Sequence, residues 1–145
     1  MAQADILPRS TNSATMVGLG GYNLMDSYLS PGSTSRNYTG MGFSVLHERM
    51  KRIALGGGRI SRQQLISAEL ARTENAAATA TDLAGFASYA LGYHYHLPSL
   101  LPGLRLLAGG QAHGLLSFIY NTRNGNNPAT TKADADLRLS AMALY

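Results

Sequence analysis

The chain has 145 residues, of which only 14% are charged, well below the roughly 25% of typical soluble domains. It contains no cysteine, which excludes disulfides and thiolate metal sites, and no apolar run of about 18 residues, which excludes a membrane-spanning helix within this sequence. The net charge of +4 comes from scattered basic residues without interleaved stacking aromatics, so no nucleic-acid partner is expected.

The chain is predicted to begin with an extended arm followed by one domain of β-strands. Residues 1–13 contain Pro8 and small polar side chains, which favour an extended N-terminal arm. The domain then covers residues 14–145. Its first strand, predicted over about 14–29, is rich in glycine and ends at a strong turn signal, residues 30–33.

A second and a third strand follow in the central part of the chain. The second is predicted over 38–53, and its alternation drifts at Leu46 and His47, which predicts a β-bulge. Three consecutive glycines, residues 56–58, predict the next turn. The third strand is predicted over 60–72.

The fourth predicted strand, residues 87–96, alternates apolar and polar side chains almost without error. A loop of small residues is predicted before it, over 73–81. One face of the strand carries Ala87, Tyr89, Leu91, Tyr93 and Tyr95, and the other carries Ser88, Ala90, Gly92, His94 and His96. A period of two residues indicates a β-strand.

Two further strands complete the predicted sheet. A connection bounded by prolines, residues 97–103, leads to a fifth strand over 104–120. A polar loop over 121–131 then leads to a sixth strand over 133–145. In the sixth strand alanine and leucine alternate with charged residues, so that one face is apolar and the other is polar.

This pattern predicts an all-β fold, an antiparallel up-and-down meander of about six strands that forms part or whole of a transmembrane β-barrel. Strands of about ten residues with an apolar face that ends in tyrosine are typical of membrane-spanning strands. Connections 54–59 and 97–103 are short, whereas 30–37, 73–81 and 121–131 are longer. Because outer-membrane barrels have short periplasmic turns, both chain ends are predicted to lie on the periplasmic side.

Aromatic side chains fall at both rims of the predicted barrel, as in the aromatic girdles of outer-membrane proteins. The predicted girdle consists of Tyr28, Tyr93, Tyr95, Phe118, Tyr120 and Tyr145. A single-chain barrel needs at least about eight strands. The expected partners are therefore the lipid bilayer or detergent, together with either the remaining strands of a longer polypeptide or copies of this chain.

Short segments along most of the chain carry a family resemblance. They are residues 26–31, 38–40, 47–48, 104–112, 120–128 and 140–142. On these segments the chain resembles an uncharacterised family of outer-membrane β-barrel proteins from Bacteroidetes. The resemblance implies a polypeptide that continues past the position of Tyr145, so that this chain is similar to an N-terminal half. It implies no assigned activity and carries over no functional residue.

A set of polar side chains is predicted to face the lumen of the barrel. The set consists of Glu48, Glu69, His94, His96, Arg105, Gln111, His113, Asp134, Asp136 and Arg138. In a narrow barrel, charges of both signs pair across the lumen, because a lone buried charge is costly. The same side chains would also suit a polar pore or a small-ligand chamber.

Two kinds of chemical site are alternatives to this network. His94 and His96, with His113 on the next strand, are weak candidates for metal ligands, and neither a metal nor another cofactor is expected. Ser88 or Ser117 with His113 and Asp134 resembles the residue types of a lipid hydrolase triad. Both serines are assigned to the inner face, away from lipid, so no enzyme activity is expected.

The predicted function is that of an outer-membrane β-barrel protein of a Gram-negative bacterium, with polar external loops and a polar lumen that serves as a small pore. A second hypothesis is a soluble lipocalin-like barrel that binds an apolar ligand, in which Tyr89, Leu91, Tyr93 and Leu137 point inward. An outer-membrane lipid hydrolase is the third hypothesis. The low charge and the aromatic rims favour the membrane barrel.

Overall fold

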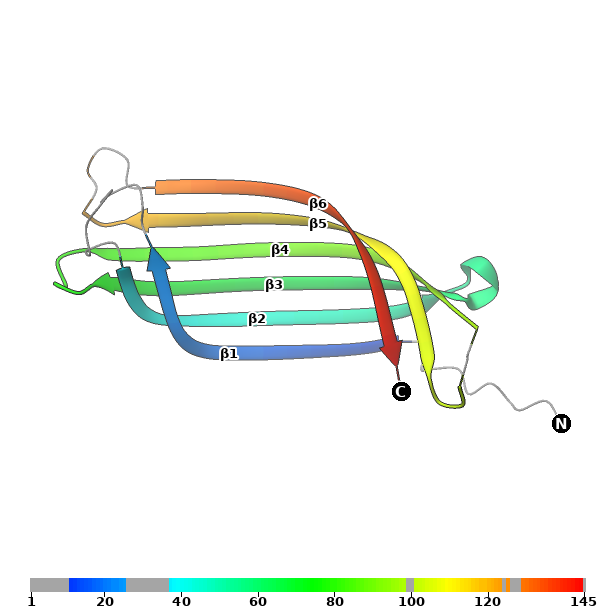
Figure 1. Cartoon of the computed structure of the whole chain (residues 1–145). Coiled ribbons are helices and arrows are strands. Elements are labelled where there is room, and N and C mark those ends of the chain that lie inside the picture. Colours follow the sequence, from blue (N-terminus) through cyan, green and yellow to red (C-terminus); the bar gives the residue numbers. More distant parts are fainter. Residues whose placement is uncertain (1–10, 26–36, 99–100, 124, 126–128, 145) are drawn as a thin grey trace.

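The protein is a single six-stranded antiparallel meander (Figure 1). The computed structural model describes residues 11–25, 37–98, 101–123, 125 and 129–144. The strands are β1 (Thr11–Met25), β2 (Asn37–Ile53), β3 (Ile60–Asn75), β4 (Thr81–His96), β5 (Arg105–Asn121) and β6 (Ala129–Leu144). Each strand pairs with the next along the chain, in the order β1-β2-β3-β4-β5-β6. The predicted all-β meander is therefore confirmed.

The hairpin between β3 and β4 is much tighter than predicted. The loop predicted over 73–81 is a turn of five residues, 76–80, because both strands extend into it. Asn75 holds the turn, since its Oδ1 accepts hydrogen bonds from the backbone N–H of Thr79 at 2.8 Å and of Ala80 at 3.1 Å. This connection is no longer than the one over 54–59, so the predicted contrast in loop length is wrong at this hairpin.

The turn between β2 and β3 is built on the three consecutive glycines. Residues Leu55–Gly58 form a short 3₁₀ turn, η2, in which Gly56, Gly57 and Gly58 have φ angles of 65°, 68° and 77°. Left-handed φ values are costly for residues that carry a Cβ atom, so this run of glycine permits the turn. The predicted turn is confirmed, and β1 begins and β6 ends at the same end of the sheet as η2 (Figure 1).

β2 runs without the predicted β-bulge. The pairing of β2 is continuous on both sides, with His47 opposite Thr15 of β1 and Ile66 of β3. His47 faces outward and its Nδ1 lies 2.8 Å from Thr15 Oγ1. The interruption in the sequence pattern arises because Leu46 is an apolar residue on the inner face, and this face also accommodates Leu107, which is 1% exposed.

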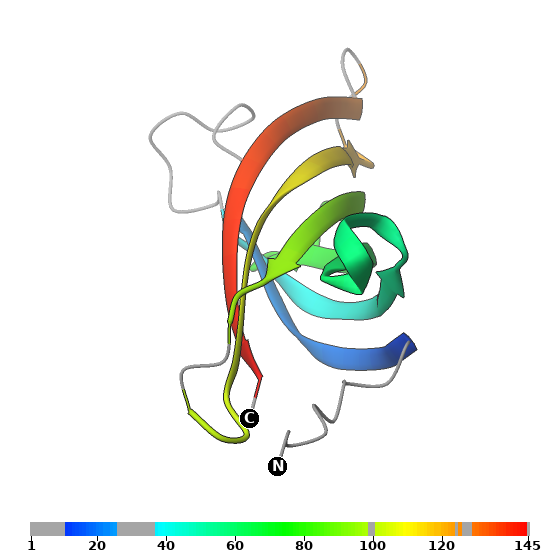
Figure 2. The ribbon, with the colours of Figure 1, turned by 90° about the vertical axis from the view of Figure 1, so that its right-hand side faces the viewer.

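The sheet curves into an open trough (Figure 2). In β4 this curvature buries one face and leaves the other exposed, as shown by His94 at 0% exposure and Tyr93 at 48%. In the edge strand β6, residues 129–139 are exposed on both faces, and Leu139 is 97% exposed. We call the buried side the concave face and the other side the outer face. In the described residues, β1 pairs only with β2 and β6 pairs only with β5. No helix in this part of the chain is long and apolar enough to cross a membrane.

Candidate functional site

The candidate site is the polar surface of the concave face. Because every strand pair is in continuous register, alternate residues of neighbouring strands form rows across the sheet. This register brings all the predicted lumen residues to the concave face. One row joins Glu48, Leu65, Ala90, His113 and Asp136. Glu69 lies in another row between Ser44 and Phe86, and Arg105 lies at the start of β5.

A chain of side-chain hydrogen bonds crosses from β5 to β2. Gln111 Nε2 donates to Gln63 Oε1 at 2.5 Å, and Gln63 Nε2 donates to Glu48 Oε1. Gly92 of β4 lies between the two glutamines in the register, and a Cβ atom there would lie 2.5 Å from Gln111 Cγ. The missing side chain at Gly92 therefore leaves the space through which Gln111 reaches β3.

A histidine crosses β5 in a similar way. His94 Nε2 lies 2.5 Å from Ser140 Oγ of β6, and Gly109 of β5 stands between these residues in the register. A Cβ atom at Gly109 would lie 2.0 Å from the Tyr93 carbonyl oxygen and 2.8 Å from His94 Cα. His96 Nε2 lies 2.7 Å from Ser61 Oγ on the other side. The two histidines thus reach in opposite directions across the concave face.

The structure does not assemble the candidate metal site. His94 and His96 contact separate serines. His113 lies four residues along β5 from Gly109, the residue that pairs with His94. In the described residues, no group of three or more histidine, cysteine, aspartate or glutamate side chains is placed to hold a metal ion. The spacing of the histidines on their strands therefore does not produce a common coordination point.

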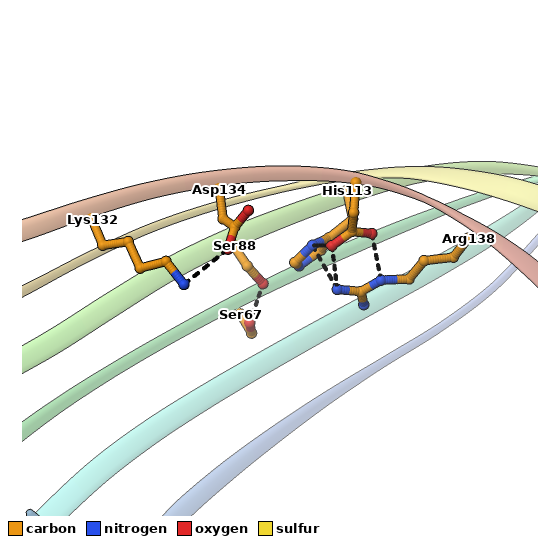
Figure 3. A network of polar contacts seen from close by, with 7 residues as sticks. Ser67, Ser88, His113, Lys132, Asp134 and Arg138 are labelled. Carbon is orange, nitrogen blue, oxygen red and sulfur yellow. Dashed lines mark hydrogen bonds and ion pairs between the residues drawn. The ribbon is translucent and has the colours of Figure 1, made fainter.

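A second cluster occupies β5 and β6 (Figure 3). Arg138 binds Asp136 through two hydrogen bonds, Nε to Oδ1 at 2.7 Å and Nη2 to Oδ2 at 2.9 Å. Arg138 Nη2 also lies 2.8 Å from His113 Nδ1, and because an arginine can only donate, this ring nitrogen is the acceptor. The contact of 3.1 Å between His113 Nδ1 and Asp136 Oδ2 is then a contact between two acceptors. Asp136 therefore does not orient His113 as a general base.

The residues of the candidate hydrolase triad have other partners. Asp134 forms an ion pair with Lys132 at 3.0 Å, and Ser88 Oγ lies 2.6 Å from Ser67 Oγ (Figure 3). Ser117 lies opposite Lys132 in the register. The ion pair lies within β6 and the serine contact joins β3 to β4, and together they use the Asp134 carboxylate and the Ser88 hydroxyl that a triad with His113 would need.

One buried polar cluster was missed by the sequence analysis. Asn121 Nδ2 donates to Asp82 Oδ1 at 2.5 Å and to the Tyr38 hydroxyl at 3.3 Å, and all three residues are buried. Thr73, with 0% exposure, lies opposite Asp82. The cluster lies at the end of the sheet away from η2, where the strands were predicted too short. Continuing the alternation of β3 and β4 to these positions would have included Thr73 and Asp82.

The predicted girdle residues lie on the outer face at two ends of the sheet. Tyr93 and Tyr95, 48% and 42% exposed, lie toward η2, where Tyr95 is opposite Ile60. Phe118 and Tyr120, 41% and 42% exposed, lie toward the other end. The remaining two members of the predicted girdle, Tyr28 and Tyr145, lie outside the described residues.

Replacing Gln63 by alanine is expected to lower the free energy of unfolding by about 1–2 kcal/mol, because it removes the partner of both Glu48 and Gln111 on a buried face. The matched control is Gln64→Ala, on the outer face, which removes a single hydrogen bond to the Tyr89 hydroxyl and is expected to cost less than about 0.5 kcal/mol. Urea unfolding of both variants in detergent measures the difference. Equal losses would show that the chain of hydrogen bonds adds no stability.

The comparisons with known proteins identify a family for the whole strand region. Comparison with curated proteins gives no match. A family model described as "Protein of unknown function (DUF3316)" matches residues 2–145, which include every strand of the sheet. The expectation that the chain resembles an uncharacterised family over most of its length is confirmed by this match. The chain belongs to the DUF3316 family of proteins of unknown function.

Proposed function

We propose that this chain spans the outer membrane of a Gram-negative bacterium as part of a transmembrane β-barrel, with its outer face against lipid and its concave face lining a polar lumen that serves as a small pore. The proposal assigns it a membrane-spanning role and no catalytic one. Short segments of the chain resemble a Bacteroidetes outer-membrane family, and this resemblance supports an outer-membrane location in a bacterium of that group.

One observation carries this proposal, the apolar belt on the outer face. Large apolar side chains are exposed on all six strands, among them Leu19, Phe43, Leu70, Tyr89, Leu116 and Leu139. Soluble monomers rarely expose contiguous apolar patches larger than a few hundred Å². The opposite face of the same strands carries five of the six described acidic side chains and the chain of hydrogen bonds from Gln111 to Glu48. Membrane barrels alternate apolar side chains toward lipid with polar ones toward the lumen in this way.

The belt also slants across the strands. At the η2 end its polar border lies at Thr15 and His47, which are paired in β1 and β2. In β3 the border lies at Gln64, which pairs with Arg49 of β2 and is therefore two residues closer to η2 than His47. In β4 the apolar face continues further, to Tyr95. A flat membrane that crosses strands tilted by roughly 35–45° meets successive strands at shifted positions, so the slant fits a tilted barrel wall.

The open edges of the sheet indicate what completes the wall. β1 and β6 each have one neighbour in the described part of the chain, and unpaired backbone groups at an edge are too costly to leave in lipid. The proposal therefore includes further strands, from a longer polypeptide or from copies of this chain, that pair with both edges. Chain ends at the η2 end would lie in the periplasm.

The soluble alternatives have less support. A lipocalin-like barrel requires Tyr89, Tyr93 and Leu137 on the inner face, but these side chains are 44%, 48% and 87% exposed on the outer face. A lipid hydrolase requires a serine and a histidine in hydrogen-bond contact near lipid. The contacts of Ser140 with His94 and of Ser61 with His96 lie on the concave face, which the proposal places away from lipid. Ser88 contacts Ser67, and His113 contacts Arg138.

The test is a gel of the native protein from the outer-membrane fraction, run with and without boiling. We expect a band that migrates faster unboiled and shifts to slower migration on heating, since closed membrane barrels resist detergent unfolding. A species found in the soluble fraction that migrates identically before and after boiling would overturn the proposal and favour the soluble barrel.

A further inference from the structure

We infer that three basic side chains on the outer face, Arg49, Lys51 and Arg62, bind the phosphate groups of anionic phospholipid headgroups. We call this cluster the basic rim. The inference rests on the proposed function, because lipid headgroups reach these side chains only if the outer face lies in a membrane. In the proposed orientation the basic rim lies at the periplasmic leaflet.

The strand register brings the three cations together. Lys51 of β2 lies directly opposite Arg62 of β3, and Arg49 is the next outward residue along β2. Like charges directly opposite each other destabilise a strand pair unless an anion lies between or above them. Arg49 and Lys51 are exposed, and Arg62 Nε is buried without a hydrogen-bond partner. The register therefore places three cations side by side on the outer face, of which Arg49 and Lys51 are exposed to an anion from outside the chain.

No carboxylate in the described residues neutralises the basic rim. Five of the six described acidic side chains face the concave side: Glu48, Glu69, Asp82, Asp134 and Asp136. The sixth, Glu74, faces outward at the far end of β3, where it forms an ion pair with Arg72 at 2.6 Å. Among the residues that the structure describes, the concave face thus carries charges of both signs, whereas the outer face at the η2 end carries only positive charge. This separation points to an anionic partner outside the sheet.

The basic rim lies where headgroups meet the apolar belt. Arg62 is opposite Tyr93, and Arg59 Nη1 donates to the Tyr95 hydroxyl at 3.4 Å. On the side toward the belt, Gln64 Nε2 donates to the Tyr89 hydroxyl at 3.0 Å, and the next outward residue of β3 is Ile66. Tyrosine rings are enriched at the level of the headgroups. The phosphates of lipids whose chains cover the belt would lie at this height.

The test compares lipids retained by the full chain. The chain is inserted into vesicles of an equal mixture of phosphatidylcholine and phosphatidylglycerol, extracted in mild detergent, and analysed by native mass spectrometry for bound lipid. Enrichment is measured as the ratio of bound phosphatidylglycerol to bound phosphatidylcholine, relative to their one-to-one ratio in the vesicle, and we expect it to lie more than about tenfold above one. In the double variant Arg49→Ser with Lys51→Ser the enrichment is expected to fall about tenfold or more, since each basic residue near a membrane surface contributes roughly fivefold.

The matched control removes the same charge elsewhere. Arg72→Ser with Arg123→Ser also removes two positive charges, from the opposite end of the sheet, and is expected to retain the enrichment. Equal losses in both double variants, or no enrichment in the wild-type chain, would overturn the inference. If the double variant does not insert, Lys51→Glu at a single exposed position is expected to lower the enrichment about fivefold or more, and an unchanged enrichment would overturn the inference.

A second readout separates this inference from the proposed function. Insertion into vesicles of phosphatidylcholine alone, followed by the gel with and without boiling, reports barrel formation without anionic lipid. A heat-shifted band without enrichment of phosphatidylglycerol overturns the inference and leaves the proposed function standing. If the native protein, with the strands that complete its wall, remains outside both kinds of vesicle, the proposed function is overturned, and the inference with it.

Discussion

Leu116→Arg is expected to destabilise the membrane-inserted chain by about 2–4 kcal/mol, the cost of an arginine facing lipid at the middle of a barrel wall. Leu116 lies within the apolar belt on β5 and is 65% exposed. In a soluble protein the same change would place a charge at an exposed position in water, where substitutions usually stay within about 0.5 kcal/mol. Urea unfolding in vesicles, with the folded fraction read from unboiled gels, measures the cost.

Leu55→Arg provides the matched control. Leu55 is also 65% exposed, but it lies in η2, outside the strands and beyond the basic rim. Near the membrane interface an arginine costs only about 0–1 kcal/mol. A large loss for Leu116→Arg with a small one for Leu55→Arg supports lipid contact on β5. Small losses for both would show that the belt faces water, which contradicts the proposed function.

The faces of the strands could be predicted because the information is local. In β4 the alternation from Ala87 to His96 assigns His94 to the same face as Ser88, and the structure buries His94 completely. No knowledge of neighbouring strands is needed for this step, since period two fixes the two faces. The same reasoning placed the charged residues of β6 on one side.

The ends of the strands could not be predicted from the same pattern. Thr73 and Asp82 belong to paired strand residues because Asn75 closes a five-residue turn between them. Small residues on both sides of that turn resemble a loop in the sequence. The expected bulge in β2 failed for a related reason: Leu46 is apolar yet inward, which a strict alternation of polar and apolar faces cannot accommodate.

The contacts within the site depend on information that the sequence does not carry locally. His94 and Ser140 are 46 residues apart, and Gln111 and Gln63 are 48 apart. Each pair spans a strand that contributes a glycine at the crossing point, Gly109 in the first case and Gly92 in the second. Only the register of three strands identifies these glycines as the positions that let a side chain pass.

Gly109→Ala is expected to lower the free energy of unfolding by about 3 kcal/mol, at the upper end of the cost of overpacking. The added Cβ atom would lie 2.0 Å from the Tyr93 carbonyl oxygen and 2.8 Å from His94 Cα, and both are backbone atoms that cannot rotate away. β4 and β5 would have to separate locally, which also breaks the contact between His94 and Ser140. Urea unfolding of the inserted chain measures this loss.

The adjacent glycine gives a control of opposite sign. At Gly110 an added Cβ atom would lie 3.5 Å from the Arg138 carbonyl oxygen, an ordinary contact distance. Because glycine within a strand is less stable than alanine by roughly 0.5–1 kcal/mol, Gly110→Ala is expected to leave stability unchanged or to raise it. The two substitutions differ only in the face of β5 on which the methyl group falls. If both variants lose the same stability, the close approach of β4 over Gly109 is not what requires glycine there.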